Sequence, residues 1–543
     1  MSADLADPAP TVACARVRQL KRMGVQRIFG LPGEDHLRLL DAIEAEGLQY
    51  IGAHDETAAA IMACAEADTS GLPGVLLVTH APGITNAVNG IANAYLDGLP
   101  LVVISGQHAA NRYALTIRQT LDNHLLLRAV TKWTATASAS IHQLLARVVS
   151  TALASPRGPV FLELREEVAA QKPLDLAEDW PIASRRPLRG AQPDDIGTLC
   201  RTLSEAQRPV ILVGGSDYAV EERGALMDWA RTMACPVFTS PSALGLLPES
   251  FEWFGGAFLN GLLERPLLDR TDLLVNVNLN ANDFFNARWP YAAPVVAIRR
   301  EPDTERFVAR AREVIGDAGP VFRELLSSGP TSRSKWVPAD VLAYRARIRA
   351  ELASPADRLT VVSALEVASA ILPDDTLVAV DAGFGKPITS YLWRPAAPRS
   401  YFASHGLSTM GYAIPAANAL KLAHPRRTVL GLLGDGSLLM RATEIRTAVE
   451  LGIAPIYLVW MDGSLTQIEM KQRLAGLRTV GAEISAPACA ELAQALGARG
   501  ADVRTLDELR SALATAVDSR LPTLIGAHID TSRHADWYSL IRA

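Results

Sequence analysis

The 543-residue sequence has few cysteines, few aromatic residues and no long apolar segment. Its five cysteines are scattered and form no Cys-x-x-Cys pair, which argues against a disulfide framework or a cysteine-ligated zinc site and favours a reducing compartment. No stretch approaches the ~20 consecutive apolar residues of a membrane-spanning helix, and the acidic N-terminus lacks the apolar core of a signal peptide. We therefore expect a cytoplasmic protein that does not interact with membranes.

The sequence also lacks an excess of positive charge. Lys and Arg number 53 against 58 Asp and Glu, for a net charge of −5, so electrostatics gives no reason to expect a nucleic-acid partner. The composition is 49% hydrophobic and 20% charged, which is typical of a globular protein.

A chain of this length is too long for one hydrophobic core. Proline and charge accumulate around residues 166–193 and 327–358, which indicates linkers there. Between the linkers, short apolar runs alternate with helical patterns, a combination typical of parallel α/β sheets. The sequence therefore predicts an α/β fold of three doubly wound parallel-sheet domains, at residues 1–175, 190–330 and 355–543.

The most informative motif is Gly434-Asp435-Gly436, followed 27 positions later by Asp462. Apolar runs at 428–433 and 456–460 predict two buried strands, and the segment 440–451 between them predicts a helix. This unit would bring both aspartates to the carboxyl ends of parallel strands, where α/β sheets bind ligands. Hard carboxylate oxygens suit Mg²⁺, and the glycines would let a diphosphate approach the backbone.

A Gly-Asp-Gly turn beside an unrelated aspartate would explain this motif equally well if it stood alone. Four further segments therefore matter: Ala53–Met62, containing Glu56; Val78–Asn86, containing His80; Phe29–Glu34; and Ser404–Gly411, containing Met410. Pro82-Gly83 favours a turn, and Thr85 and Asn86 suit the N-cap of the helix that follows. Residues 380–385 also predict a strand that leads into a glycine turn.

Together these segments resemble the thiamine diphosphate enzymes, and most closely the group of acetolactate synthase, benzoylformate decarboxylase and pyruvate decarboxylase. The resemblance spans most of the chain. It implies thiamine diphosphate and Mg²⁺ as cofactors, with Asp435, Asp462 and Ser464 at the metal. It also implies cofactor contacts from Glu56, Pro82, Asn86, Gly383, Phe384, Gly385, Ser408, Met410, Gly434, Gly436 and Ser437.

The resemblance implies three catalytic residues. Glu56 would hydrogen-bond the pyrimidine ring and activate the cofactor, while His80 and Glu34 would transfer protons. Each residue type also has a purely structural explanation. Carboxylates are common at helix starts, where the helix dipole favours them, and a histidine can be held by a backbone hydrogen bond.

Two departures from the family pattern bear on the substrate. The usual second metal ligand is asparagine, whereas this chain has Asp462, which makes the site more negative. Arg118 stands near the usual position of an aromatic residue and offers a planar fork to a carboxylate or phosphate. We expect the substrate pocket to include Arg118, Gln119, Gln467, Ile468 and Lys471.

The leading hypothesis is a decarboxylase or carboligase of the acetolactate synthase type, acting on a small 2-oxo acid through an enamine intermediate. A carbon–carbon lyase acting on acyloins or other hydroxy ketones, diketones or 2-hydroxyacyl thioesters is an alternative, and a non-catalytic cofactor-binding protein is a third. The resemblance implies a homodimer or homotetramer with active sites at subunit interfaces. Flavin adenine dinucleotide (FAD), which some relatives hold in the central domain, is not favoured, because segment 275–283 lacks an arginine-rich character.

Overall fold

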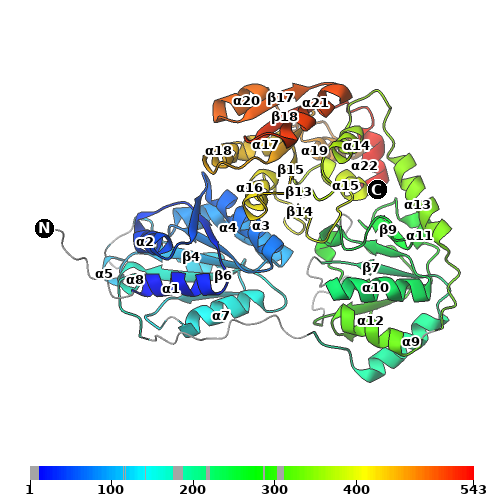
Figure 1. The fold of residues 1–543 in the computed structure, drawn as a ribbon, viewed down its shortest axis with the longest axis horizontal. Coiled ribbons are helices and arrows are strands. Elements are labelled where there is room, and N and C mark those ends of the chain that lie inside the picture. Colours follow the sequence, from blue (N-terminus) through cyan, green and yellow to red (C-terminus); the bar gives the residue numbers. More distant parts are fainter. Residues whose placement is uncertain are drawn as a thin grey trace. The chain divides into compact units, whose positions relative to one another are not determined.

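The computed structural model describes residues 11–113, 115, 118–140, 142–174, 188–215, 220–284, 288–302, 308, 311–329 and 331–542. In this part of the chain the strands form three six-stranded sheets (Figure 1). All paired strands in these sheets run parallel. The predicted α/β class with three parallel sheets is therefore confirmed.

The chain divides into two compact units. The first comprises Met1–Arg186 with the short segment Asn418–Ala423, and the second comprises Pro187–Ala417 with His424–Ala543. The first sheet lies in the first unit, and the other two sheets lie in the second. The domain boundaries given above, at residues 1–175, 190–330 and 355–543, stay predictions.

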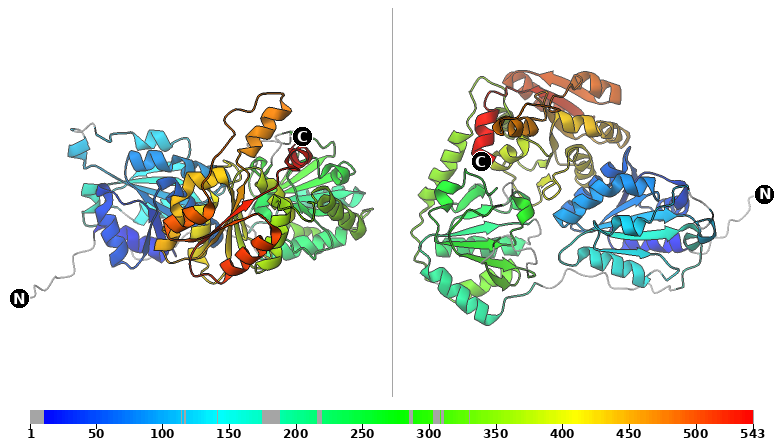
Figure 2. Two further views of the ribbon diagram at one scale, coloured as in Figure 1. Left: turned by 90° about the horizontal axis from the view of Figure 1, so that it is seen from above. Right: turned by 180° about the vertical axis from the view of Figure 1, so that it is seen from behind.

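The first sheet has the strand order β2-β1-β3-β4-β6-β5. Because the order reverses between β1 and β3, the loops after these two strands open onto a common crevice. Helices α1, α2 and α7 share an apolar core with alternate residues of β3, β4 and β6, whereas α3 and α4 pack against each other on the other side (Figures 1 and 2). The elements are α1 (Val12–Arg22), β1 (Arg27–Gly30), η1 (Glu34–His36), α2 (Leu37–Ala45), β2 (Gln49–Gly52), α3 (Glu56–Ser70), β3 (Gly74–Val78), α4 (Pro82–Asp97), β4 (Leu101–Gln107), α5 (Ala110–Tyr113), α6 (Asn123–Leu127), β5 (Trp133–Thr136), α7 (His142–Leu153), β6 (Val160–Arg165) and α8 (Glu166–Ala169).

Small side chains let α3 and α4 approach closely. A Cβ atom added at Gly90 of α4 would lie 2.4 Å from Cβ of Ala60 on α3. The alanine-rich sequence of α3 is buried along almost its whole length. This packing fixes the start of α3, where Glu56 lies.

The second sheet has the order β12-β11-β10-β7-β8-β9 and reverses between β7 and β10. Helices α10 and α12 pack against each other along this sheet (Figure 1). The elements are α9 (Pro193–Glu205), β7 (Pro209–Val213), α10 (Val220–Met233), β8 (Val237–Thr239), η2 (Pro241–Ala243), β9 (Phe254–Ala257), α11 (Arg265–Leu268), β10 (Leu273–Val277), η3 (Ala281–Asp283), β11 (Val295–Arg299), β12 (Arg312–Ile315) and α12 (Ala318–Ser327), followed by the connecting helix α13 (Pro338–Glu351).

The third sheet has the order β14-β13-β15-β16-β18-β17. It reverses between β13 and β15, so the loops after these strands, and after the neighbouring β16, lie along one crevice. The elements are α14 (Val361–Ile371), β13 (Leu377–Val380), α15 (Gly385–Leu392), β14 (Tyr401–Ala403), α16 (Ala413–Ala423), β15 (Val429–Gly434), α17 (Asp435–Arg441), α18 (Thr443–Glu450), β16 (Ile456–Met461), α19 (Thr466–Leu474), α20 (Cys489–Leu496), β17 (Arg499–Val503), α21 (Leu506–Val517), β18 (Thr523–His528) and α22 (His534–Arg542).

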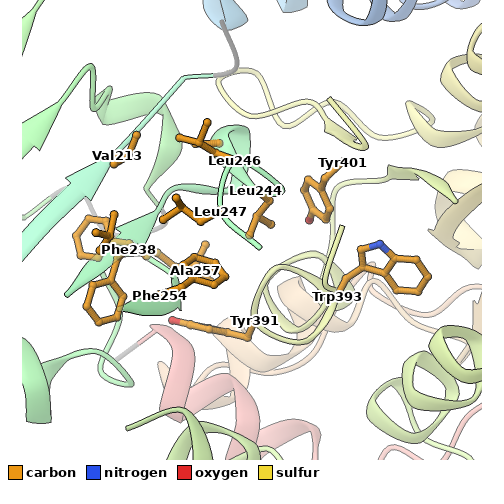
Figure 3. Close-up of a cluster of buried hydrophobic side chains, with 14 of the residues drawn as sticks. Val213, Phe238, Leu244, Leu246, Leu247, Phe254, Ala257, Tyr391, Trp393 and Tyr401 are labelled. Carbon is orange, nitrogen blue, oxygen red and sulfur yellow. The ribbon is translucent and has the colours of Figure 1, made fainter. Parts of the chain in front are cut away.

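A continuous apolar core joins the second and third sheets within the second unit. Figure 3 shows Leu244 and Leu247, from the segment after β8, facing Tyr391 of α15 and Tyr401 of β14. Tyr391 donates a hydrogen bond of 2.8 Å to the buried carboxylate of Glu264. Burial raises the pKa of Glu264, and this contact anchors α15, the helix that follows the glycine turn.

All five cysteines are free thiols, and three of them are buried. Among the described residues, no helix combines the length and apolar character needed to cross a membrane.

Candidate active site

The Gly-Asp-Gly turn closes the carboxyl end of β15 and opens a helix. The sequence predicted this helix over residues 440–451, but α17 already begins at Asp435, and α18 continues from Thr443. That boundary was wrong because the first turn of α17 is built from glycine and polar residues, which give no apolar periodicity. An aspartate at this position is favoured by the helix dipole.

The carboxylates of Asp435 and Asp462 lie at the ends of the neighbouring strands β15 and β16, as predicted. Asp435 accepts hydrogen bonds of 2.8 Å from the backbone N–H groups of Gly436 and Gly463. Asp462 accepts a 2.5 Å hydrogen bond from the Thr466 hydroxyl. The two loops are therefore tied together through the carboxylate of Asp435.

Without a cation nearby, the ionised form of both carboxylates is unfavourable. Burial raises the pKa of Asp462 to about 6; the Thr466 hydrogen bond opposes this, and the charge of Asp435 adds to it. Burial also raises the pKa of Asp435, against its backbone hydrogen bonds. A divalent cation would relieve both the desolvation and the mutual repulsion. In the described part of the chain, no group of three or more His, Cys, Asp or Glu side chains is arranged to hold a metal.

A cavity of about 370 Å³ adjoins these carboxylates, within the range of about 300–1,000 Å³ that is usual for small-molecule sites. It opens where the third sheet reverses its strand order. The sequence-predicted residues that line it are Gly383, Phe384, Gly385, Ser408, Met410, Gly434, Asp435, Gly436, Ser437, Asp462, Ser464, Gln467 and Ile468.

Glycine is required at two of these positions by close packing. A Cβ at Gly385 would lie 2.7 Å from Nε1 of Trp460. At Gly436 it would lie 2.9 Å from side-chain carbons of Leu465 and Ile484 and 3.2 Å from Cε of Met410. The tip of Met410 is therefore in contact with the Gly-Asp-Gly turn, although the two residues belong to different loops.

The loop that carries Met410 is held by two buried charged residues whose roles the sequence did not reveal. The Lys386 ammonium donates a 2.5 Å hydrogen bond to the carbonyl of Ser404. The carboxylate of Asp381 accepts hydrogen bonds of 3.0 Å from Gly411 N–H and 2.7 Å from the Ser437 hydroxyl. Burial raises the pKa of Asp381 to about 6, against these hydrogen bonds. Asp381 thus links the Met410 loop to α17.

Ser408 in the same loop has a φ angle of +52°. This left-handed conformation is unfavourable for a residue with a side chain and marks functional positions more often than ordinary turns. The backbone of the loop is therefore held in one specific conformation next to the cavity.

The first turn of α19 contributes Gln467 and Ile468 to the cavity wall. Lys471, one turn further on, is exposed and does not line the cavity. In this unit the helical spacing therefore places two of the three predicted side chains together.

In the first unit, Glu56 is the first residue of α3 and only 8% exposed. Asp55 caps the helix by accepting a 2.9 Å hydrogen bond from Ala58 N–H. The Glu56 carboxylate accepts a 2.5 Å hydrogen bond from the side-chain amide of Asn86. Glu56 is therefore a buried carboxylate held by one neighbour, which does not fit the alternative of a solvated helix start.

Thr85 and Asn86 do not cap the next helix. Helix α4 begins at Pro82, and its N-cap is Ala81, which has a φ angle of +51°. The prediction was wrong because proline is well suited to the first helical position, so the N-cap lies four residues before Thr85. Asn86 instead lies in the first turns of α4, from which its amide reaches Glu56.

His80 follows β3 and is 1% exposed. Its Nδ1 lies 2.7 Å from Oδ2 of Asp35, its backbone N–H donates to the same oxygen at 2.9 Å, and its Nε2 lies 3.2 Å from Nε2 of His108. His36 also bonds Asp35, with Nδ1 2.9 Å from Oδ1. Asp35, His36 and His108 were not among the functional residues predicted from the sequence. The Gly-Glu-Asp-His run after β1 was the available signal, because it ends a strand beside the sheet's reversal point.

Glu34 begins η1, beside the Asp35 cluster. Arg118 and Gln119 are exposed, and Gln119 has a φ angle of +59°. Within the first unit the structure brings Glu56 and Asn86 together, and within the second unit it brings together the predicted residues that line the cavity.

Three family models of the thiamine pyrophosphate enzymes match the chain. The N-terminal thiamine pyrophosphate binding domain matches residues 10–127, the central domain residues 196–325, and the C-terminal thiamine pyrophosphate binding domain residues 381–527. A probable 2-ketoarginine decarboxylase, AruI of Pseudomonas aeruginosa, is 31% identical over 95% of this chain and 93% of its own length. The chain belongs to the thiamine pyrophosphate enzyme family.

Acetolactate synthases are also among the relatives of this thiamine pyrophosphate enzyme. The large subunit from Haemophilus influenzae and the isozyme 3 large subunit from Escherichia coli are each 28% identical, over 95% of this chain and 94% of their own lengths. The family resemblance inferred from the motifs is therefore confirmed, as is the dependence on thiamine diphosphate, which is another name for thiamine pyrophosphate.

The central domain of this thiamine pyrophosphate enzyme shows an ion pair near the carboxyl edge of its sheet. Arg300, just after β11, lies 2.9 Å from the buried carboxylate of Asp317. Parts of this edge fall outside the described residues. The expectation that flavin is not bound stays a prediction.

Proposed function

We propose that this enzyme is a decarboxylase or carboligase that acts on a small 2-oxo acid with thiamine diphosphate and Mg²⁺. The observation that carries the proposal is the cavity at the reversal point of the third sheet, with the buried carboxylate of Asp435 and the half-buried carboxylate of Asp462, both of raised pKa, on its wall. The relatives named as 2-ketoarginine decarboxylase and acetolactate synthase support this class of reaction.

The residues present fit the cofactor. Space is open at Gly383 and Gly434, where an added Cβ would meet no atom within 4 Å, so a diphosphate could lie against the backbone. Asp435 and Asp462, with Ser464, would hold the Mg²⁺, and Gly385, Gly436 and Ser437 would border the diphosphate. When bound, thiamine diphosphate supplies a carbon nucleophile and an electron sink for cleaving the bond next to a carbonyl.

Each part of the chain would have its own task in this reaction. Glu56, desolvated and held by Asn86, would hold a proton against the pyrimidine ring. Met410 would support the bend of the cofactor through its contact with the Gly436 turn, and the carbonyl of Ser408 would accept a hydrogen bond from the aminopyrimidine. Gln467 and Ile468 would shape the substrate end of the cavity. Pro82 and Phe384 remain proposed cofactor contacts, and Glu34, Arg118, Gln119 and Lys471 remain proposed substrate-side residues.

We further propose that the complete site forms between two copies of the chain, in a homodimer or homotetramer. Glu56 belongs to the first unit, whereas Asp435, Asp462 and Met410 belong to the second. The family resemblance implies that these two sets face each other across a subunit interface. Analytical ultracentrifugation with and without cofactor would test this, and a fully active monomer would contradict it.

A carbon–carbon lyase acting on acyloins, diketones or 2-hydroxyacyl thioesters is the alternative, because it would use the same cofactor and the same cavity. A non-catalytic binding protein is less well supported. A carboxylate that is 8% exposed and that, among the described residues, is hydrogen-bonded by one amide is costly to retain unless it is used.

The test is carbon dioxide release with thiamine diphosphate and Mg²⁺ from a panel of 2-oxo acids that includes pyruvate and 2-ketoarginine, together with product analysis. Release with an aldehyde product would establish a decarboxylase, and release with an acyloin would establish a carboligase. If the protein binds the cofactor but releases no carbon dioxide from any acid, the proposal fails in favour of the lyase, which cleavage of an acyloin panel would then identify.

A further inference from the structure

His80, the residue expected to transfer a proton, cannot reach a substrate directly. It is 1% exposed, and both of its ring nitrogens are occupied inside the protein. Nδ1 bonds Asp35 at 2.7 Å, and Nε2 bonds His108 at 3.2 Å. To present a ring nitrogen to a ligand, His80 would have to break one of these contacts.

The bonds to Asp35 determine which nitrogens carry protons. Asp35 receives four donors: the backbone N–H and Nδ1 of His80 on Oδ2, and Nδ1 of His36 with the Thr79 hydroxyl on Oδ1. Burial alone would raise the pKa of Asp35, but the hydrogen bonds from His36 and His80 outweigh it and lower the pKa well below its usual range. Asp35 is therefore an ionised acceptor, and both imidazoles carry their hydrogen on Nδ1.

This assignment removes His36 from any proton transfer. Its Nε2 accepts a 3.0 Å hydrogen bond from the backbone N–H of Gly33, which a protonated Nε2 could not do. His36 is therefore neutral and fully hydrogen-bonded, and it serves to hold Asp35 in place.

His80 and His108 remain as a pair that shares one proton. A contact between two Nε2 atoms needs a hydrogen on one of them, and either imidazole can hold it. The two ring centroids are 4.3 Å apart at an interplanar angle of 68°. His108 lies at the end of β4 and is only partly buried, and among the described residues its Nδ1 has no hydrogen-bond partner.

We propose that His108 exchanges the proton with the reacting molecule, and that His80 and Asp35 act behind it as positioning residues. In the positively charged state of the pair, each imidazole carries a hydrogen on Nδ1, a third hydrogen lies between the two Nε2 atoms, and Asp35 is ionised. His108 then gives up its Nδ1 proton, and the proton shared between the Nε2 atoms passes from His80 to His108. Both imidazoles then end neutral, and the net charge of the pair falls by one. The reverse transfer takes up a proton. This inference rests on the proposed function, because it presumes a reaction with a proton-transfer step.

The surroundings of His108 favour its neutral form at rest. Burial lowers its pKa, and the charges of His80 and Arg112 lower it further, whereas Asp35 and Glu34 act in the opposite direction. An imidazole that is neutral at rest and can share an added proton with a buried partner suits transfer in both directions near neutral pH.

Imidazole rescue is the decisive experiment. We expect His108→Ala to lower kcat by about 10²- to 10⁴-fold, the usual contribution of a general acid–base group, with KM little changed. Added imidazole should restore part of this loss, because the missing ring lay at a partly exposed position. His80→Ala should also be slow but should not respond to imidazole, because its ring lies in the buried cluster. His124→Ala, which removes another partly exposed histidine of the same unit, is the control and should retain turnover.

The proposal is overturned if His108→Ala keeps kcat within about twofold of the parent, or if imidazole rescues His80→Ala but not His108→Ala. A purely structural role for His108 would lower stability without giving imidazole-dependent turnover. Thermal melting of each variant separates these two effects.

A second readout does not need turnover. With ¹⁵N-labelled histidine, we expect NMR spectra to show His36 with a hydrogen on Nδ1 and none on Nε2. A scalar coupling between the Nε2 nuclei of His80 and His108 should report the hydrogen that the two rings share. Absence of this coupling would overturn the shared proton even if a substrate is found. If no 2-oxo acid is turned over, the proposed function fails, while the NMR result still decides the coupling.

Discussion

Each of the two units buries an aspartate at the reversal point of a parallel sheet, Asp35 in the first and Asp435 in the second, yet their environments are opposite. In the first unit, Asp35 receives four hydrogen bonds from protein donors, and its pKa is lowered. In the second unit, burial raises the pKa of Asp435 and Asp462, which also repel each other. The same residue type at the same kind of strand end therefore has opposite electrostatics.

The difference shows what each carboxylate is suited to do. Asp35 is satisfied by the chain itself and can orient an imidazole permanently. Asp435 and Asp462 keep a raised pKa in spite of the hydrogen bonds they accept, so we expect the protein to gain stability from a cation. We expect the first unit to be indifferent to metal and the second to respond to it.

The largest expected effect is on turnover. Glu56→Gln should lower kcat by about 10²- to 10⁴-fold while the cofactor still binds, because the amide cannot hold the proton that the carboxylate holds. Cofactor binding is followed by titration calorimetry and turnover by product formation. Asp68→Asn removes a carboxylate from the same helix about 18 Å further along and is the control. Unchanged turnover in Glu56→Gln would contradict the catalytic assignment.

The next effect is on the stability of the first unit. Asp35→Asn should lower the free energy of unfolding by about 3 kcal/mol, because an amide cannot accept from all four donors. A lowered pKa means that the stabilisation is present above the ordinary aspartate pKa of about 3.9 and is lost as the pH falls below it. The difference in free energy of unfolding between variant and parent, measured by urea denaturation, should therefore be largest at pH 7 and decrease in acid. The control is the exposed Asp41→Asn change on α2, whose free energy of unfolding should stay within about 0.5 kcal/mol of the parent. Equal losses from the two changes would contradict this explanation.

The second unit should show the opposite pH dependence in the absence of metal. Because the pKa of Asp462 is raised to about 6, its folded state binds the proton more tightly than the unfolded state, and stability falls as the pH rises through this range. At pH 8 the free energy of unfolding should be lower by about 3 kcal/mol, because the pKa of Asp462 in the folded state lies about two pH units above the ordinary aspartate pKa. Mg²⁺ with thiamine diphosphate should reverse it.

Melting curves with and without chelator test this expectation. We expect a larger effect of the chelator at pH 8 than at pH 5. Asp462→Asn should stabilise the metal-free protein at pH 8 and weaken Mg²⁺ binding. Equal melting temperatures with and without chelator at both pH values would show that the site is not held by a cation.

The smallest expected effect concerns helix capping. Helix α3 is capped by the Asp55 side chain, whereas α17 begins after Gly434, which has no side chain to cap with. Asp55→Ala should cost about 1 kcal/mol of stability in the first unit, while Asp55→Asn, which keeps the capping oxygen, should cost little. Asp55 also accepts a 3.0 Å hydrogen bond from the side-chain amide of Asn86. If both variants lost the same stability, this contact rather than the cap would be responsible.

The sequence was sufficient to predict the strand ends at which much of the second unit's candidate site lies. The strand–helix–strand pattern around Asp435 and Asp462 predicted two neighbouring strand ends because a β-α-β unit is a local, right-handed connection. The same reasoning placed Glu56 at the start of a helix and Gly383 after a strand. Local patterns failed at the start of α17 and at the cap of α4, where glycine or proline replaced the expected periodic and capping signals.

The cluster of Asp35, His80 and His108 could not be inferred in this way. These residues follow β1, β3 and β4, which are separated along the chain and become neighbours only through the strand order of the first sheet. The contacts of Asp381 with the Met410 loop and with α17 have the same origin. The sequence by itself determined the parallel α/β class and the identity of the cofactor-binding motifs, because both depend on local patterns. Only the tertiary structure decided which side chains share a proton, because sheet order, and not distance along the chain, brings strand ends together.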